Sequence, residues 1–135
     1  MFRFLAVVFA IALTPAQQPH PKLWAAISVE QPVVAQNTQT LQISFGLVND
    51  GDTTVNPNVE ASHLLINGVE PKDWPFVISN GIRTSSFTAL PPGHSLLFGY
   101  QLGRYFLRPG IYTVRWESDN FKSPDLTFRV MTSLQ

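Results

Sequence analysis

The chain of 135 residues contains no cysteine, and this absence removes several kinds of chemistry. It excludes disulfides, thiolate metal sites, a cysteine nucleophile and a lipidated N-terminal cysteine. Charge is scarce too, because Asp, Glu, Lys and Arg make up only 13% of the chain, with nine basic side chains against nine acidic ones. A nucleic-acid-binding protein normally carries a basic excess, so we expect no nucleic-acid partner. The 44% of hydrophobic residues is enough for a packed core, which excludes a disordered chain.

A short apolar run follows a single positive charge at the N-terminus. Arg3 precedes ten apolar residues over 4–13, and Thr14-Pro15-Ala16 then supplies the small residues found at signal-peptidase sites. The run is far shorter than the ~20 residues that cross a bilayer as a helix. We therefore expect a signal peptide over residues 1–16, cleaved after Ala16. The alternative is an uncleaved anchor or a buried helix.

The expected signal peptide places the mature chain outside the cytoplasm. No Asn-x-Ser/Thr sequon occurs in the sequence, which favours bacterial export. We expect a secreted or periplasmic protein with no membrane span once the signal is removed. Residues 17–22 are Pro-rich and are expected to form a flexible leader, followed by one β-sandwich over 23–131 and a tail over 132–135.

Alternating apolar and polar residues predict short strands along the whole mature chain. Asn67-Gly68 favours a two-residue type I′ hairpin, and Asn80-Gly81 suggests a second short hairpin. Seven or eight strands separated by turn residues at nearly regular spacing predict an all-β fold, an antiparallel sandwich. The expected strands cover 23–30, 41–49, 62–66, 69 onward, 85–90, 96–102, 112–117 and 126–130, and the short runs 76–78 and 82–84 flank the suggested second hairpin turn.

One run in the second half of the chain resembles a known fold family. Arg108-Pro109-Gly110-Ile111-Tyr112-Thr113-Val114 is similar to the start of strand F in immunoglobulin-like domains, where a Gly-x-Tyr tyrosine bonds the backbone upstream. Together with Leu47-Val48-Asn49-Asp50-Gly51-Asp52 and Leu90-Pro91-Pro92-Gly93, it resembles bacterial immunoglobulin-like and fibronectin type III-like domains over about residues 41–130. The layout is also similar to the intracellular proteinase inhibitor-type sandwich family.

The resemblance implies structural roles for alternate residues of this strand. Tyr112 would close the preceding turn, and Val114 stands where such domains often carry a cysteine. Apolar packing against Ile43 or Phe45 would then replace a disulfide between the sheets. Trp116 continues the same core-facing alternation.

Few side chains suggest catalysis or metal binding. Asp50 and Asp52 are too few for a calcium site and are ordinary turn residues. Ser95 follows a histidine, but neighbours on a strand point to opposite faces, so the pair forms no catalytic dyad. The histidines lack zinc-site spacing and lie at His20, His63 and His94. We expect no enzyme activity, no metal and no cofactor.

Aromatic residues in expected turns provide the candidate binding site. Aromatic side chains dominate contact energy at protein interfaces, so an exposed group of them would serve as anchors. The alternative is that these rings cover the open ends of the sandwich. The four predicted anchors are Trp74, Tyr105, Phe106 and Phe121.

The hypothesis drawn from the sequence is an exported, non-enzymatic immunoglobulin-like domain. It would bind a protein or an envelope component through loops or an edge strand. The alternatives are a secreted proteinase inhibitor and a carbohydrate-binding module. The sequence leaves open the oligomeric state and the identity of any partner.

Overall fold

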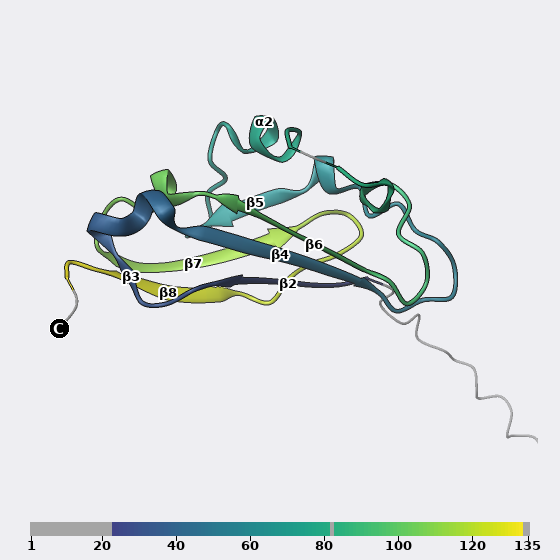
Figure 1. The fold of residues 1–135 in the computed structure, drawn as a ribbon, viewed down its shortest axis with the longest axis horizontal. Helices are drawn as coiled ribbons and strands as arrows, with labels where there is room; N and C mark the ends of the chain where they lie inside the picture. Colours follow the sequence, from purple (N-terminus) through teal and green to yellow (C-terminus); the bar gives the residue numbers. More distant parts are fainter. Residues whose placement is uncertain (1–22, 82, 134–135) are drawn as a thin grey trace, which may run out of the picture.

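The protein folds as two packed β-sheets in the computed structural model, which describes residues 23–81 and 83–133. The expected signal peptide and leader lie outside these residues. One sheet has three strands in the order β2 (Leu23–Val29), β4 (Gln42–Asn49) and β6 (Ser95–Gln101). The other has four, in the order β3 (Val33–Val34), β8 (Leu126–Met131), β7 (Gly110–Glu117) and β5 (His63–Ile66). The chain is therefore all-β in class, and Figure 1 shows the two layers.

The three-stranded sheet follows the alternation in the sequence. In β4, Ile43, Phe45 and Leu47 are buried, whereas the residues between them face outward. β4 pairs antiparallel with both neighbours, and Phe45 lies opposite Ile27 on β2 and Phe98 on β6. The predicted strands over 23–30, 41–49 and 96–102 are confirmed, with ends that differ by at most one residue.

The four-stranded sheet includes β7, the strand that the alternation over 112–117 predicts. Val114 and Trp116 are fully buried, and the Tyr112 hydroxyl donates a 2.7 Å hydrogen bond to the Arg108 carbonyl. The expected closure of the turn by this tyrosine is thereby confirmed. The β5–β7 and β7–β8 pairs are antiparallel, but β3 pairs parallel with β8. This short strand was missed because two residues carry no alternation.

Aromatic rings from both sheets meet in the core. The Phe45 ring is perpendicular to Trp116 across the sandwich at a centroid distance of 5.0 Å, and it stacks on Phe98 at 5.1 Å. Ser62 satisfies two buried indoles, because its hydroxyl accepts from Trp116 Nε1 and its carbonyl accepts from Trp74 Nε1. Apolar packing thus joins the two sheets without a disulfide.

The segment between β5 and β6 departs from the predicted strands. Asn67 and Gly68 adopt φ angles of 50° and 85°, and Ile66 and Val69 exchange hydrogen bonds, so the first hairpin turn is confirmed. Residues 76–78, predicted as a strand, belong instead to helix α2 (Trp74–Ile78). Pro75 sits in the first turn of this helix, where a missing N–H is tolerated.

The expected strand over 85–90 is also wrong. It is the 3-10 turn η4 (Ser85–Phe87), followed by a single bridge between Leu90 and Val55. The described residues also include the 3-10 segments η2 (Ala35–Thr40), η3 (Val59–Ala61) and η5 (Gly103–Tyr105). Figure 1 shows α2 at the side of the sandwich, beyond β5 and β6. None of the helices within residues 23–81 and 83–133 is long and apolar enough to cross a membrane.

Candidate binding surface

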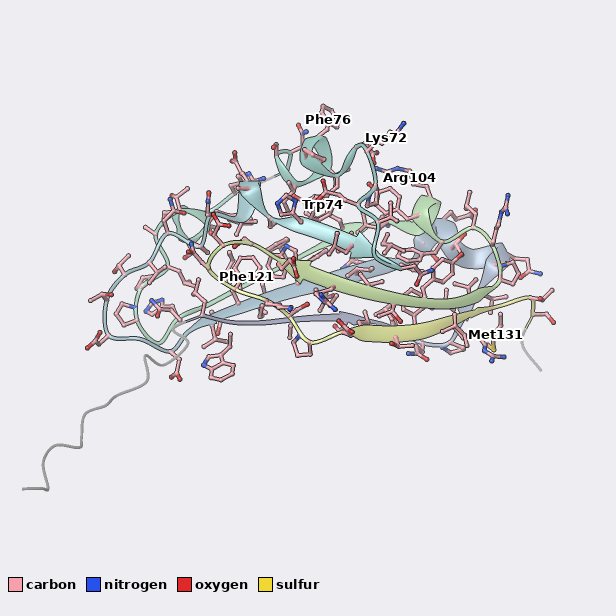
Figure 2. All side chains as sticks on the ribbon, turned by 180° about the vertical axis from the view of Figure 1, so that it is seen from behind. Lys72, Trp74, Phe76, Arg104, Phe121 and Met131 are labelled. Atoms are coloured by element: carbon pink, nitrogen blue, oxygen red, sulfur yellow. The ribbon has the colours of Figure 1, made fainter. Side chains whose placement is uncertain are left out.

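Three of the four predicted aromatic anchors are buried. Trp74 and Phe106 have no exposed surface and Phe121 has 5%, so the expectation that these rings are exposed is wrong. Trp74 and Ile78 lie four residues apart on α2 and both point into the core, whereas Phe76 is 72% exposed. Figure 2 shows Trp74 beneath the helix and Phe76 on its outer side.

Each buried ring covers a different part of the core. The Phe121 centroid lies 4.5 Å from that of Trp116, and the Phe106 centroid lies 5.2 Å from that of Phe128. The rings therefore close the open ends and side of the sandwich, which is the alternative that the sequence left open. Loop residues pack under their own loops because the sandwich ends would otherwise expose apolar surface.

Tyr105, the fourth predicted anchor, belongs to a polar cluster that fastens α2 to η5. The Asp73 carboxylate accepts from the Tyr105 hydroxyl and from the Arg104 guanidinium, each at 2.6 Å. These hydrogen bonds, first from Tyr105 and then from Arg104, lower the pKa of the Asp73 carboxyl. Burial, followed by the Asp73 contact, raises the pKa of Tyr105. The cluster is a structural tie between two surface segments.

The two histidines and the turn aspartates that the structure describes do not converge on a site. His20 lies outside the described residues, and His63 Nδ1 is 2.8 Å from the Glu70 carboxylate on the surface. Asp50 accepts a 3.1 Å hydrogen bond from Trp24 Nε1. No group of three or more His, Cys, Asp or Glu that could hold a metal occurs among the residues the structure describes.

A buried amide organises the turn that follows β4. Asn49 has no exposed surface, and its side-chain nitrogen donates to the carbonyls of Thr53 and Leu90 at 2.8 and 2.9 Å. Its side-chain oxygen accepts from the Gly51 backbone. The Asn-Asp-Gly run is therefore a hydrogen-bonded turn, and it holds Asp50 beside Trp24.

The outward side of the three-stranded sheet carries no charged side chain. We call this surface the uncharged face. It contains exposed apolar residues beside hydroxyl and amide groups, and the side chains of Leu97 and Trp24 are 78% and 53% exposed. The uncharged face consists of Trp24, Ala26, Ser28, Gln42, Ser44, Gly46, Val48, Ser95, Leu97, Gly99 and Gln101.

Small residues at the centre of the uncharged face make it flat. A Cβ on Gly46 would lie 3.1 Å from the Leu97 side chain, and one on Gly99 would lie 2.6 Å from Gln42 Nε2. Leu97 and Gln42 thus lie across the two glycines. A shallow depression of about 480 Å³ remains between them, with Ala26 and Ser44 also in its lining. It has room for a partner side chain or a sugar ring.

Trp24 stands at one end of the uncharged face. Its hydrogen bond to Asp50 fixes the indole while leaving half of the side chain exposed. A second depression, also about 480 Å³, lies beside it and is lined by Phe121, Lys122 and Pro124 among others. The indole is therefore a preorganised contact at the rim between the sheet and the β7–β8 loop.

Within the part of the chain that the structure describes, β6 pairs with β4 alone, so its other backbone edge is open. Where its pairing with β4 begins and ends, Leu102 N–H donates to the Leu41 carbonyl and Asn49 N–H donates to the His94 carbonyl. Hydrogen-bonded positions alternate along an antiparallel pair, so every second residue of β6 points its N–H and C=O away from β4. These residues are Ser95, Leu97, Gly99 and Gln101.

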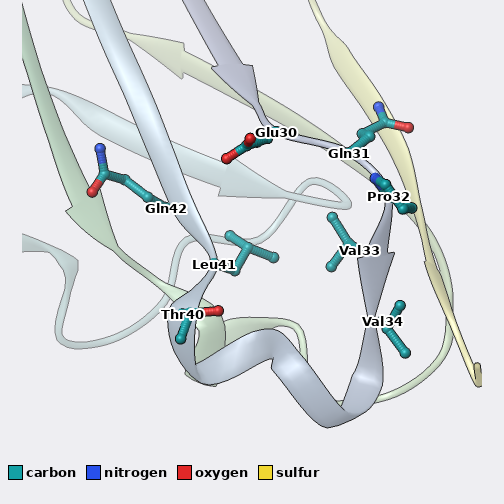
Figure 3. A pocket seen from close by; sticks show the side chains of 8 residues that line it. All are labelled: Glu30, Gln31, Pro32, Val33, Val34, Thr40, Leu41 and Gln42. Carbon is teal, nitrogen blue, oxygen red and sulfur yellow. The ribbon is translucent and has the colours of Figure 1, made fainter.

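Another depression lies where the chain crosses from one sheet to the other. Its volume is about 290 Å³, and it opens between the end of β2 and the start of β4. Figure 3 shows Val33 and Leu41 on opposite sides of it, with Glu30 at the rim. Glu30 is the one charged residue in the lining, so the depression gathers no set of groups for catalysis.

The outward side of the four-stranded sheet carries ionisable side chains. We call it the charged face; it includes His63, Arg115, Glu117 and Arg129. Arg115 Nε lies 2.8 Å from the Asp125 carboxylate, and this hydrogen bond holds the pKa of Asp125 below its usual value. Arg115 also lies 3.8 Å from the Glu117 carboxylate, and His63 pairs with Glu70, so three of these four side chains have a partner of opposite charge or a carboxylate within reach.

Comparison of the chain with protein-family models, curated proteins and solved structures finds no match. The candidate surface is therefore supported by its own composition and geometry, without a known relative. Sequence reasoning missed it, although a signal was present. The three segments that form β2, β4 and β6 contain no Asp, Glu, Lys, Arg or His, whereas β5, β7 and β8 each contain at least one.

Proposed function

We propose that the protein is an exported, non-enzymatic immunoglobulin-like domain that binds a protein or an envelope component through the uncharged face. The observation that carries the proposal is the composition of that face. An exposed surface with apolar side chains and no charge, on a protein whose other sheet is charged, favours a contact surface. Such a contact would bury no unpaired charge, which would otherwise be costly.

The strand order supports the immunoglobulin-like assignment. Taken in chain order, β2, β4 and β6 match strands A, B and E of that fold, and β5, β7 and β8 match C, F and G. The Tyr112 hydrogen bond to Arg108 occupies the place of the tyrosine corner. In this assignment, α2 takes the position of the connection that carries strand D.

The contact surface differs from the one first expected. The buried loop aromatics cannot reach a partner without unfolding part of the core, whereas Trp24, Val48 and Leu97 are already exposed. Rigid strands hold these side chains in place, so binding would cost little ordering of the backbone.

The test is affinity capture with crosslinking, using the chain from Gln17 onward against envelope and secreted fractions of the source cell. Ser44→Lys places a charge in the central depression of the uncharged face. Thr127→Lys is the matched control, since it makes a similar change at an exposed position of the charged face. A partner lost with Ser44→Lys and kept with Thr127→Lys supports the proposal. A partner bound equally by both variants contradicts it.

A carbohydrate-binding module is the second candidate, because the exposed indole of Trp24 lies on the same face as the amide and hydroxyl groups of Gln42 and Ser44. Aromatic rings stack on sugars, while amides and hydroxyls bond their hydroxyl groups. Binding to a neutral glycan array that disappears in Trp24→Ala would favour this candidate. Silence on the array would remove it.

A further inference from the structure

We propose that β6 pairs with β6 of a second copy of the chain, antiparallel about a two-fold axis. The two three-stranded sheets would then join into one six-stranded sheet. This inference goes beyond the proposed function, because it concerns self-association at the sheet edge and requires no other partner.

The first support is the free backbone of β6. No backbone hydrogen bond of the described residues reaches the outward N–H and C=O groups of Leu97 or Gly99. An edge strand with such groups is a template for another strand. Addition of a strand satisfies them directly, as in β-augmentation.

The second support is that the residues of β6 lack the sequence features that normally protect an edge. Over Ser95–Gln101 it has no charged residue and no proline. Charges, prolines and short length are the usual ways of blocking edge pairing. Two of the other edges have them, because β5 begins with His63 beside Glu70 and β3 has only two residues, whereas β2 is uncharged over Leu23–Val29 and meets Glu30 and Pro32 directly after its end.

The third support is that β6 is complementary to itself in one register. If the two-fold axis passes Phe98, Leu97 of each copy lies opposite Gly99 of the other, and Ser95 lies opposite Gln101. The largest exposed side chain of the strand then lies beside a residue with no side chain of its own, over which Gln42 of the neighbouring strand extends. All four outward residues fall in hydrogen-bonded pairs, which gives about eight hydrogen bonds across the axis.

Charge also favours a second copy as the occupant. In a two-fold interface the same patch faces itself, so a charged residue near the axis would face a like charge. The uncharged strand avoids this repulsion. One edge contact is smaller than a standard stable interface of ~1,600 Å², so we expect a weak, reversible dimer.

Pairing through β6 would double the uncharged face. Two copies of the face would lie side by side on one continuous sheet, and a partner with two epitopes could bind both. This consequence rests on the proposed function, whereas the pairing itself can be measured without a partner.

The first experiment is sedimentation analysis of the chain from Gln17 onward, between about 10 μM and about 1 mM, the range expected for a small interface. We expect a monomer–dimer equilibrium for the wild-type protein. Leu97→Lys puts charges near the axis and should raise the dimer dissociation constant at least tenfold. Ile111→Lys, the same kind of change at an exposed apolar residue of β7, should leave it unchanged.

Ser44→Lys distinguishes pairing at the β6 edge from partner binding through the uncharged face. It should leave the dimer unchanged, even where it abolishes capture of a partner. A wild-type protein that stays monomeric to about 1 mM overturns the inference. A dimer that is lost with Ser44→Lys but kept with Leu97→Lys also overturns the inference, because the two copies would then contact each other through their uncharged faces.

The second experiment tests the register by disulfide crosslinking. The wild-type protein has no cysteine, so only the introduced residues can form a disulfide. Opposed residues of a hydrogen-bonded antiparallel pair have Cα atoms ~5.5 Å apart, within disulfide reach. A mixture of Ser95→Cys and Gln101→Cys proteins should therefore give a crosslinked heterodimer on mild oxidation, more readily than either protein alone. Trp24→Cys mixed with Ser28→Cys is the control on β2. Crosslinking that is equal in both mixtures, or stronger on β2, would refute pairing through β6.

Discussion

The two outer faces of the sandwich are built from the same kind of strand yet differ in composition. The uncharged face has Trp24, Ser44 and Leu97, and it has no ionisable group. The charged face has Arg115 and Arg129, and its ion pairs are solvated. Inner residues build the core for both sheets, so outward residues contribute little to the fold. The difference between the faces therefore concerns what each face contacts and how it is solvated, whereas both sheets share the same core.

The largest expected effect concerns the core that the two faces share. Phe45→Ala should lower the free energy of unfolding by about 3–5 kcal/mol, because Phe45 contacts both sheets and leaves a cavity. Val48→Ala, on the outer side of the same strand, should cost less than about 1 kcal/mol. Urea denaturation of both variants measures this. Similar losses would show that the outer face also supports the fold.

A smaller effect is expected at the turn that ends β4. Asn49→Ala removes the buried amide that bonds Thr53 and Leu90, leaving carbonyls unsatisfied, and should cost about 1–3 kcal/mol. His63→Ala, which removes the exposed pair with Glu70 on the charged face, should cost at most ~1 kcal/mol. Denaturant midpoints compare the two. A larger loss for His63→Ala would contradict the view that the charged face adds little stability.

The turn before β7 gives the corresponding test on the four-stranded sheet. Tyr112→Phe keeps the ring packing against Phe106 and removes the hydrogen bond to the Arg108 carbonyl. The expected cost is about 1 kcal/mol, since a typical hydrogen bond contributes that much. Thermal unfolding of Tyr112→Phe beside wild type checks it. No change in the unfolding temperature would count against a structural role of the hydroxyl.

The smallest expected effect is a change in acid stability at the side closed by α2. The folded state lowers the pKa of Asp73 below 3.8, through Tyr105 and Arg104. The stabilisation is fully present above that value and is lost as the pH falls through the lowered pKa. Asp73→Asn should therefore flatten the acid limb of the stability profile and leave other regions of the profile unchanged in shape. Unfolding titrations between pH 2 and pH 7 would detect it, and parallel profiles would argue against the tie.

Regular strands could be read from the sequence because the alternation in β4 and β7 reflects burial directly. The helix α2 could not, since five residues after Asp73 resemble a short strand as much as a helix. The spacing of four between Trp74 and Ile78, with Pro75 in the first turn, was the available signal. Strand β3 has too few residues for any periodic pattern.

Three of the four predicted anchors are buried because the exposure of a loop side chain depends on the tertiary structure. Whether Phe106 or Phe121 in a loop faces solvent depends on which part of the core lies beneath it, and this is set by strand order. Strand order cannot be read from strand count. The uncharged face, in contrast, could have been predicted by comparing the outward-facing residues of the three strands with one another.

The three tryptophans differ sharply in their environment. Trp74 and Trp116 are sealed in the core, with both indole N–H groups bonded to Ser62, and Trp24 alone meets solvent. The intrinsic fluorescence of the folded protein therefore contains one component that soluble quenchers reach and two that they do not. Any ligand, partner or second copy that covers Trp24 will shield that component and shift its emission. The protein thus carries a label-free optical reporter at one end of its uncharged face.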